Sequence, residues 1–214
     1  MNTGSKSKLV LIDCDGVLYS PSELDINAFI PAFNETCNDF KCPDIKFNFI
    51  EYCAKCKSVK GIYNYINYVA NQIGVATDVF ITKIVEHIDY SNITPDKDGI
   101  LEKLKTLQNK YEICICSNNH LMHIDKILKA KFNISANKFP FKIFDMTYAQ
   151  EKGVFYHKES DVFISKLAKH FNINAKNFIW IDDSLDIIEK IKKSGCKTFQ
   201  ITEQKCLSNI LDLL

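Results

Sequence analysis

Residues 9–18 read Leu9-Val10-Leu11-Ile12-Asp13-Cys14-Asp15-Gly16-Val17-Leu18, a short apolar run that passes directly into two carboxylates. Apolar runs without alternation are typical of strands that are buried on both faces of a parallel sheet. Carboxylates at the end of such a strand are costly unless they are paired, protonated or bound to a metal. The stretch therefore predicts an inner strand with a functional site at its carboxyl end.

Three further apolar runs end in polar clusters in the same way. Residues 113–116 lead into Ser117-Asn118, residues 142–144 into Asp145, and residues 178–181 into Asp182-Asp183. Apolar residues at helical spacing lie between these runs, over 100–107, 162–171 and 185–191, and residues 197–201 read as a further strand. This alternation predicts the α/β class, with a Rossmann-like, doubly wound parallel sheet.

The segment 21–95 interrupts the alternation, because it contains helical patterns and no convincing buried strand. Its candidate apolar stripes are Phe29-Ile30-Phe33, Ile62-Tyr65-Ile66-Val69 and Val79-Phe80-Ile84-Val85-Ile88. We therefore expect residues 1–20 and 96–214 to form the sheet domain, and residues 21–95 to form an inserted, all-helical module.

Oxygen ligands without histidine gather at the predicted strand ends, in the form of Asp13, Asp15, Asp182 and Asp183. Such a set favours a hard cation, Mg²⁺ before Zn²⁺. Ser117-Asn118 offers a hydroxyl and backbone amides at a helix N-terminus, which suits an anion, and a lysine could neutralise a phosphate oxygen. Together these groups describe phosphoryl transfer.

A second copy of the short motif, Asp96-Lys97-Asp98-Gly99, shows how little it means alone. This copy follows a proline, has no apolar strand before it and opens a helix, so we interpret it as a turn and helix start. Neither copy fits a calcium loop, since position 12 from Asp96 is Leu107 and position 5 from Asp13 is Val17. The strand that precedes Asp13 is what distinguishes the first copy.

These motifs together resemble the haloacid dehalogenase (HAD) superfamily of phosphohydrolases, over the whole chain except its polar leader. The first motif, D-x-D-G-x-L, matches residues 13–18; the second, a Ser or Thr after an apolar strand, matches Ser117; and the fourth, an acidic pair, matches Asp182-Asp183. The helical segment lies where members of this superfamily carry a C1-type cap. The resemblance implies a hydrolase with a HAD core and a helical cap.

The third motif of the superfamily is a lysine at the start of a helix. Lys158 lies 24 residues before Asp182, which suits members that carry K-P-D-P there, whereas Lys152 lies 30 residues before it and fits less well. The chain departs from K-P-D-P, since it reads Lys158-Glu159-Ser160-Asp161. Lys158 is the candidate that we carry forward.

The resemblance implies that Asp13 attacks phosphorus and becomes an aspartyl-phosphate. Asp15 then protonates the leaving oxygen and later activates the water that hydrolyses the intermediate. Because this order requires a protonated acid when substrate binds, we expect the pKa of Asp15 to be raised. Since dehalogenating members lack this second acid, Asp15 favours phosphate chemistry.

The remaining site residues are assigned by the same resemblance. Mg²⁺ is expected on Asp13, the Asp15 backbone carbonyl and Asp183, with Asp182 either a direct or an indirect partner. The transferring oxygens are expected on three groups: Ser117, the Asn118 amide and Lys158.

The substrate is expected to be a small phosphorylated metabolite. Residues 178–184 and 15–19 resemble the corresponding motifs of pyrimidine 5′-nucleotidases, which points to a nucleoside 5′-monophosphate. Sugar phosphates and phosphoglycolate-like acids stay open, and phosphomutases share all four motifs. The alternative of another class is a catalytically weak HAD-fold binding or regulatory protein.

Composition narrows the partners. With 27 basic and 26 acidic residues the net charge is +1, so no large positive field favours nucleic acid. No apolar run approaches the ~20 residues of a membrane helix, and the polar leader does not resemble a signal peptide. We expect a cytoplasmic protein without a disulfide framework, whose oligomeric state the sequence does not decide.

Several side features permit two interpretations each. Four cysteines of the helical segment, Cys37, Cys42, Cys53 and Cys56, have zinc-like spacing, but we favour reduced thiols because the pairs lack the compactness of a zinc knuckle. We interpret His120 and His123 as helix-surface residues rather than site residues, and Tyr63, Tyr65 and Tyr68 as packing residues rather than a platform for a base or sugar. Asp186 either supports the metal site or simply lies in the first turn of its helix, where an acidic residue is favourable.

Overall fold

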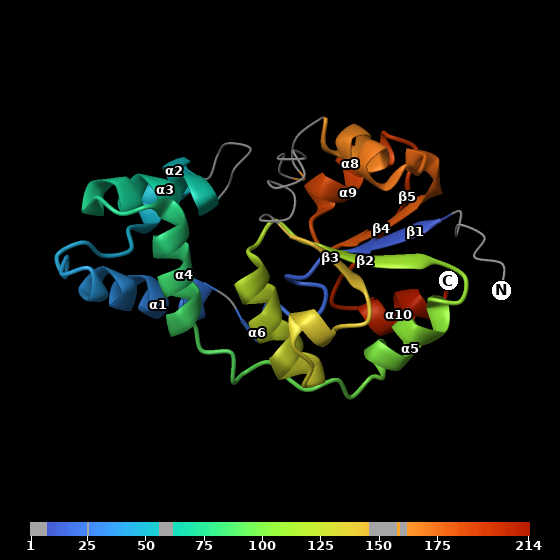
Figure 1. Ribbon diagram of the computed structural model, residues 1–214, viewed down its shortest axis with the longest axis horizontal. Helices are drawn as coiled ribbons and strands as arrows, with labels where there is room; N and C mark the ends of the chain where they lie inside the picture. Colours follow the sequence, from blue (N-terminus) through green and yellow to red (C-terminus); the bar gives the residue numbers. More distant parts are fainter. Residues whose placement is uncertain (1–7, 25, 56–61, 146–157, 159–161) are drawn as a thin grey trace. The chain divides into compact units, whose positions relative to one another are not determined.

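The computed structural model describes residues 8–24, 26–55, 62–145, 158 and 162–214 (Figure 1). The chain divides into two compact units. One unit contains the residues up to Pro21 and those from Ile93 onward, and the other is Ser22–Asn92.

The first unit is built on a five-stranded, fully parallel sheet with the order β3-β2-β1-β4-β5. The strands are β1 (Leu9–Ile12), β2 (Glu112–Cys116), β3 (Lys142–Phe144), β4 (Phe178–Asp182) and β5 (Lys197–Gln200). β1 lies in the middle, paired with β2 on one side and β4 on the other. Because all strands run in the same direction, their carboxyl ends meet at one edge, and the predicted α/β fold is confirmed.

Helices cover both faces of this sheet. They are α5 (Ile100–Leu107), α6 (Leu121–Phe132), α8 (Phe163–Phe171), α9 (Leu185–Lys192) and α10 (Leu207–Leu211), with short 3-10 helices η1 (Ala136–Lys138) and η2 (Ala175–Asn177). Figure 1 shows α8 and α9 on one face and α5, α6 and α10 on the other. All four residues of β1 are fully buried, which explains why its sequence is apolar throughout rather than alternating.

Local signals fix where the helices begin. The Ser184 hydroxyl accepts a hydrogen bond from the Ile187 amide at 3.4 Å and caps α9. In the second motif copy, both carboxylate oxygens of Asp96 accept amide hydrogen bonds from the first turn of α5, at 2.9 and 3.0 Å. Gly99 takes the left-handed conformation there, with φ +66°. The second motif copy is therefore a helix start, as the sequence predicts, and Asp96 caps that helix.

The secondary structure of the second unit consists of helices, with no strand among its described residues. It contains α1 (Ile26–Asp39), α2 (Phe49–Lys55), α3 (Ile62–Ile73) and α4 (Thr77–His87). Aromatic rings form its core: Phe33 lies 5.5 Å from both Tyr65 and Phe80 between ring centroids, and Phe47 packs against Phe33 and Tyr65. The role of this unit as a cap stays a prediction.

Within the described ranges, no helix has both the length and the apolar character needed to cross a membrane.

Candidate active site

Asp13 is the first residue after β1 and is held at the carboxyl edge of the sheet. Its amide donates to the Ile181 carbonyl of β4 at 2.9 Å, and the residue is only 7% exposed. The Lys158 ammonium contacts one of its carboxylate oxygens directly. Burial raises the pKa of Asp13, and the Lys158 charge opposes this shift without cancelling it. The strand thus presents a carboxylate whose negative charge is costly unless cations compensate it.

The backbone turns sharply after Asp13, and Gly16 makes this turn possible. Gly16 has φ +69°, and a Cβ atom built on it would lie 2.2 Å from Asp183 Oδ2. Only glycine adopts this conformation readily and leaves room for the carboxylate. The turn therefore brings the backbone of the first motif against the side chain that follows β4.

Three carboxylates converge beside this turn. Asp13, Asp182 and Asp183 each offer an oxygen, and these oxygens all lie within 4.8 Å of one another. Asp183 is half-buried, and burial, followed by the charge of Asp182, raises its pKa. Its backbone carbonyl accepts from Gln200 Nε2 at 3.1 Å. This concentration of negative charge suits a bound cation.

Asp182 has less freedom than its neighbours, because both of its oxygens already accept hydrogen bonds. Oδ1 accepts from the Ser184 amide, and Oδ2 accepts from both Trp180 Nε1 and Lys158 Nζ, each at 3.1 Å. Asp182 is almost fully buried. The geometry therefore directs Asp182 toward Lys158 and leaves Asp183 as the less occupied carboxylate.

Lys158 lies between Asp13 and Asp182 and is only 4% exposed. Burial lowers its pKa, but the two carboxylates outweigh this effect and hold the pKa of Lys158 above its ordinary value. Its amide donates to Asn118 Oδ1 at 3.2 Å, which ties it to the loop after β2. Lys152, the competing candidate, lies outside the described residues.

Ser117 follows β2, the strand beside β1. Its amide donates to the Phe144 carbonyl of β3 at 3.0 Å, and its buried hydroxyl accepts from the Asn119 amide at 3.1 Å. The same hydroxyl lies 3.5 Å from Asp15 Oδ2. The structure thus brings Ser117 and Asn118 to the same edge as Asp13, Asp15, Lys158 and the acidic pair.

Asp15 is held by donors from three segments of the chain. Oδ1 accepts from the Tyr19 hydroxyl and lies 2.9 Å from His123 Nε2, and Oδ2 accepts from Asn119 Nδ2 at 2.5 Å. Partial burial raises the pKa of Asp15, but the His123 charge and hydrogen bonds from His123, Tyr19 and Asn119 outweigh it, so the pKa lies well below the usual range. The expected rise in the pKa of Asp15 is therefore wrong for the protein without substrate.

The interpretation of His123 as a helix-surface residue is also wrong, since the residue is only 9% exposed and its side chain faces Asp15. A sequence signal existed: His123 lies four residues before Ile127 and so shares the buried stripe of α6. His120 is the N-cap residue of the same helix, and the Leu121 amide donates to Asp145 Oδ2 at 3.0 Å. Asp145 thus helps to fix the start of α6.

The other side features contribute little to this site. Tyr65 is fully buried in the aromatic core of the second unit, where its hydroxyl accepts from the Asn48 amide, so it is a packing residue. Asp186 is exposed in the first turn of α9. Cys56 lies outside the described residues. Within the part of the chain that is described, the aspartates 13, 182 and 183 are the one group arranged to hold a metal.

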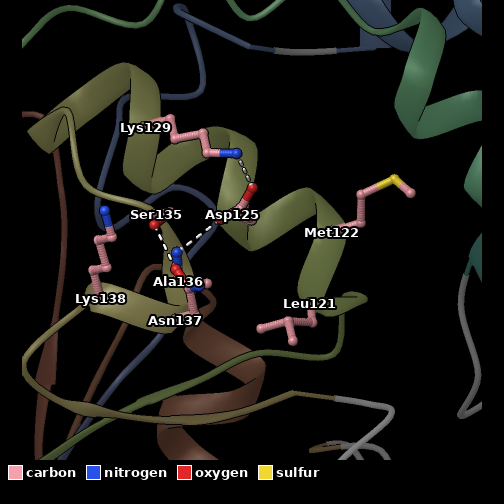
Figure 2. Close-up of a pocket in the computed structure, with 8 residues that line it drawn as sticks. All are labelled: Leu121, Met122, Asp125, Lys129, Ser135, Ala136, Asn137 and Lys138. Atoms are coloured by element: carbon pink, nitrogen blue, oxygen red, sulfur yellow. Dashed lines mark hydrogen bonds and ion pairs between the residues drawn. The ribbon is translucent and has the colours of Figure 1, made fainter.

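A separate pocket lies between α6 and η1 and is lined by none of these candidate residues (Figure 2). Within it, Asp125 accepts a hydrogen bond from the Ala136 amide at 2.7 Å and forms an ion pair with Lys129 Nζ at 2.6 Å. The pocket therefore adds no group to the site at the sheet edge.

Known proteins were compared with this chain by sequence and by structure. A family model described as haloacid dehalogenase-like hydrolase matches residues 7–195. No curated protein matches the sequence.

Among solved structures, a HAD family enzyme from Bacteroides thetaiotaomicron, in complex with magnesium and inorganic phosphate, shares 17% identity over 95% of this chain and 98% of its own, with a TM-score of 0.59. CbbY from Rhodobacter sphaeroides, in complex with phosphate, shares 15% sequence identity over 89% of this chain and 84% of its own, with a TM-score of 0.62. A HAD-superfamily hydrolase from Geobacter sulfurreducens shares 17% over the full length of both chains, with a TM-score of 0.51. At these identities the likeness concerns the fold.

Proposed function

Because this chain belongs to the haloacid dehalogenase-like hydrolases, we propose that it is a magnesium-dependent phosphatase that hydrolyses a small phosphate monoester through Asp13. The observation that carries the proposal is the position of Asp13. It lies buried at the end of the central strand, in contact with Lys158. One of its carboxylate oxygens lies within 4.8 Å of a carboxylate oxygen of each member of the acidic pair.

In the first step, a carboxylate oxygen of Asp13 forms a bond to phosphorus while the bond between phosphorus and the ester oxygen breaks. The departing oxygen takes a proton from Asp15 and leaves as an alcohol. Lys158 and the donors of the loop after β2, which are the Ser117 hydroxyl and the Asn118 amide, stabilise the charge on the transferring oxygens. The product of this step is an aspartyl-phosphate.

In the second step, the Asp15 carboxylate takes a proton from water as the water oxygen attacks phosphorus. The bond between phosphorus and Asp13 breaks, and inorganic phosphate leaves. The lowered pKa of Asp15 keeps this carboxylate ionised, which is the state that accepts a proton from water. For the first role, the negative charge of an arriving phosphate raises the pKa of Asp15 and favours its protonation.

The donor set fits Mg²⁺. Carboxylate oxygens of Asp13 and Asp183, together with the Asp15 backbone carbonyl, are the hard ligands that this ion prefers, and the absence of His and Cys from the described cluster argues against Zn²⁺. When bound, Mg²⁺ neutralises charge on the phosphate oxygens. Since both oxygens of Asp182 accept hydrogen bonds, we assign Asp182 to holding Lys158 rather than to direct coordination.

The substrate class beyond a phosphate monoester rests on sequence resemblance. The match of residues 178–184 to pyrimidine 5′-nucleotidases makes pyrimidine nucleoside 5′-monophosphates the first compounds to test. CbbY has been crystallised as a mutant with xylulose 1,5-bisphosphate, so sugar phosphates follow. Tyr65 offers no platform for a base, because it is fully buried.

Phosphate release from a panel of monoesters, measured with and without Mg²⁺, tests the proposal. We expect Mg²⁺-dependent turnover that Asp13→Asn reduces by at least about 10³-fold. The matched control is Asp98→Asn, which changes an exposed carboxylate in the second motif copy and should leave turnover unchanged. Retained activity in Asp13→Asn contradicts the nucleophile assignment. Absence of turnover on every ester, together with tight binding of a protein partner, favours a regulatory protein instead.

A further inference from the structure

We propose that His123 and Tyr19 are positioning residues that hold the acid–base group Asp15 in its working orientation, an inference that rests on the proposed phosphatase function. Neither residue belongs to the four motifs that identify the superfamily in this sequence. Both meet the same carboxylate oxygen, Asp15 Oδ1, one through a hydroxyl and the other through a ring nitrogen at 2.9 Å.

The two residues reach Asp15 from different parts of the fold. Tyr19 lies four residues further along the turn after β1, and His123 lies in the first turn of α6, which follows the neighbouring strand β2. Both residues are largely buried, with 6% of Tyr19 and 9% of His123 exposed, so water competes little for these contacts. The direction of Asp15 Oδ1 is therefore set by packed elements rather than by solvent.

The other oxygen of Asp15 is fixed as well. Oδ2 accepts from Asn119 Nδ2 at 2.5 Å and lies 3.5 Å from the Ser117 hydroxyl. A carboxylate that meets donors on both oxygens has one preferred orientation, because rotation breaks several bonds at once. Removal of the donors on Oδ1 leaves only the contacts on Oδ2, so the carboxylate is less tightly oriented while the backbone of the turn stays in place.

Orientation matters because Asp15 acts on a single atom of the substrate, the ester oxygen. A misplacement of about 1 Å is enough to cost about 10²-fold in rate. The cost depends on the leaving group, however, since a stable leaving group departs without a proton and an alkoxide does not. A residue that acts through Asp15 should therefore affect esters of weakly acidic alcohols and spare esters of acidic phenols.

Benzyl phosphate and p-nitrophenyl phosphate make the matched pair of probes. Both carry one aromatic ring, but benzyl alcohol is a much weaker acid than p-nitrophenol. The constant kcat/KM covers the steps up to departure of the leaving group, so it includes the acid step and excludes the later hydrolysis of the aspartyl-phosphate. For His123→Ala we expect kcat/KM to fall by about 10-fold or more with benzyl phosphate, and by less than about 2-fold with p-nitrophenyl phosphate.

Two further variants separate positioning from general damage. His123→Gln places an amide donor near the position of Nε2 and should restore most of the activity toward benzyl phosphate. Tyr19→Phe removes a single hydroxyl and should show the same leaving-group dependence as His123→Ala. It therefore tests the positioning role even if His123→Ala folds poorly. The control Ile124→Val changes a buried neighbour in the same helix and should affect both esters equally or not at all.

Calorimetric titration with Mg²⁺ gives a readout that does not depend on turnover. Because the Asp15 side chain is not among the proposed ligands, His123→Ala and Tyr19→Phe should bind the ion as tightly as the wild type. Equal losses on both esters, a failure of His123→Gln to restore activity, or a weakened affinity for Mg²⁺ would each overturn the positioning role. A wild-type protein inactive on both esters, or an active Asp13→Asn variant, overturns the proposed function and this inference with it.

Discussion

Gly16→Ala should weaken the metal site far more than it destabilises the protein. At φ +69° an alanine costs about 1–2 kcal/mol in backbone strain, partly offset by the smaller entropy of the unfolded chain. The new methyl would also lie 2.2 Å from Asp183 Oδ2, well inside any tolerated contact, so the carboxylate must move. Since Asp183 is a proposed ligand, we expect the affinity for Mg²⁺ to fall by at least about 10-fold.

The second copy of the motif provides the control. Gly99 has nearly the same backbone conformation, with φ +66°, but a Cβ atom there meets nothing within 4 Å. Gly99→Ala therefore carries the same strain without the clash. Both variants should lower Tm by about 2–4 °C for each kcal/mol lost, whereas only Gly16→Ala should weaken Mg²⁺ binding in a calorimetric titration.

Two outcomes would contradict the proposed link between Gly16, Asp183 and Mg²⁺ binding. If Gly16→Ala binds Mg²⁺ as tightly as the wild type, then Asp183 is not a ligand or the carboxylate is not confined by the turn. If Gly99→Ala weakens binding to the same extent, the effect comes from general destabilisation rather than from the contact between Gly16 and Asp183.

Two further substitutions and one metal analysis have separate expected outcomes. The raised pKa of Asp183 means that its contribution to stability is fully present below the ordinary pKa of an aspartate and is lost as pH rises through the raised value. Without metal, Asp183→Asn should therefore unfold at a higher temperature than the wild type at neutral pH, with a difference that shrinks in acid, and it should lose Mg²⁺ affinity; an unchanged Tm at neutral pH contradicts the burial argument. Trp180→Phe removes a buried donor to the Asp182 carboxylate and should lower the free energy of unfolding by about 1.5–3 kcal/mol, measured by urea unfolding followed by circular dichroism. An unchanged free energy of unfolding contradicts a net contribution of the indole hydrogen bond. Purified protein should contain no stoichiometric zinc, and a zinc ion that is lost on Cys53→Ser would show this expectation to be wrong.

The sheet was predictable because its signal is local. Each inner strand is a short apolar run, and the polar residue that follows each run marks the edge where the site forms. The helix start at Ser184 and the capping role of Asp96 also follow from neighbours within five residues. Resemblance to superfamily members with a lysine at this spacing from the acidic pair predicts Lys158, and the structure places its Nζ 3.1 Å from Asp182 Oδ2.

The surroundings of Asp15 were not predictable in the same way. Its pKa depends on Tyr19, which lies four residues away, and on Asn119 and His123, which the sheet and α6 bring to it from more than a hundred residues along the chain. No sequence pattern near Asp15 predicts its contacts with Asn119 and His123. His123 also belongs to a residue type that is common on helix surfaces, and only its place in the apolar stripe of α6 indicates that it is buried.

The central place of β1 has a consequence for how the protein folds. Leu9 pairs with Glu112 on one side and with Phe178 on the other, so the sheet closes loops of more than a hundred residues before the pairings stabilise it. Chains dominated by such distant pairings fold slowly, and an intermediate that lacks β4 has no acidic pair beside Asp13. The single tryptophan of the chain lies in β4. Its fluorescence during refolding should therefore change at the step that creates the capacity for catalysis.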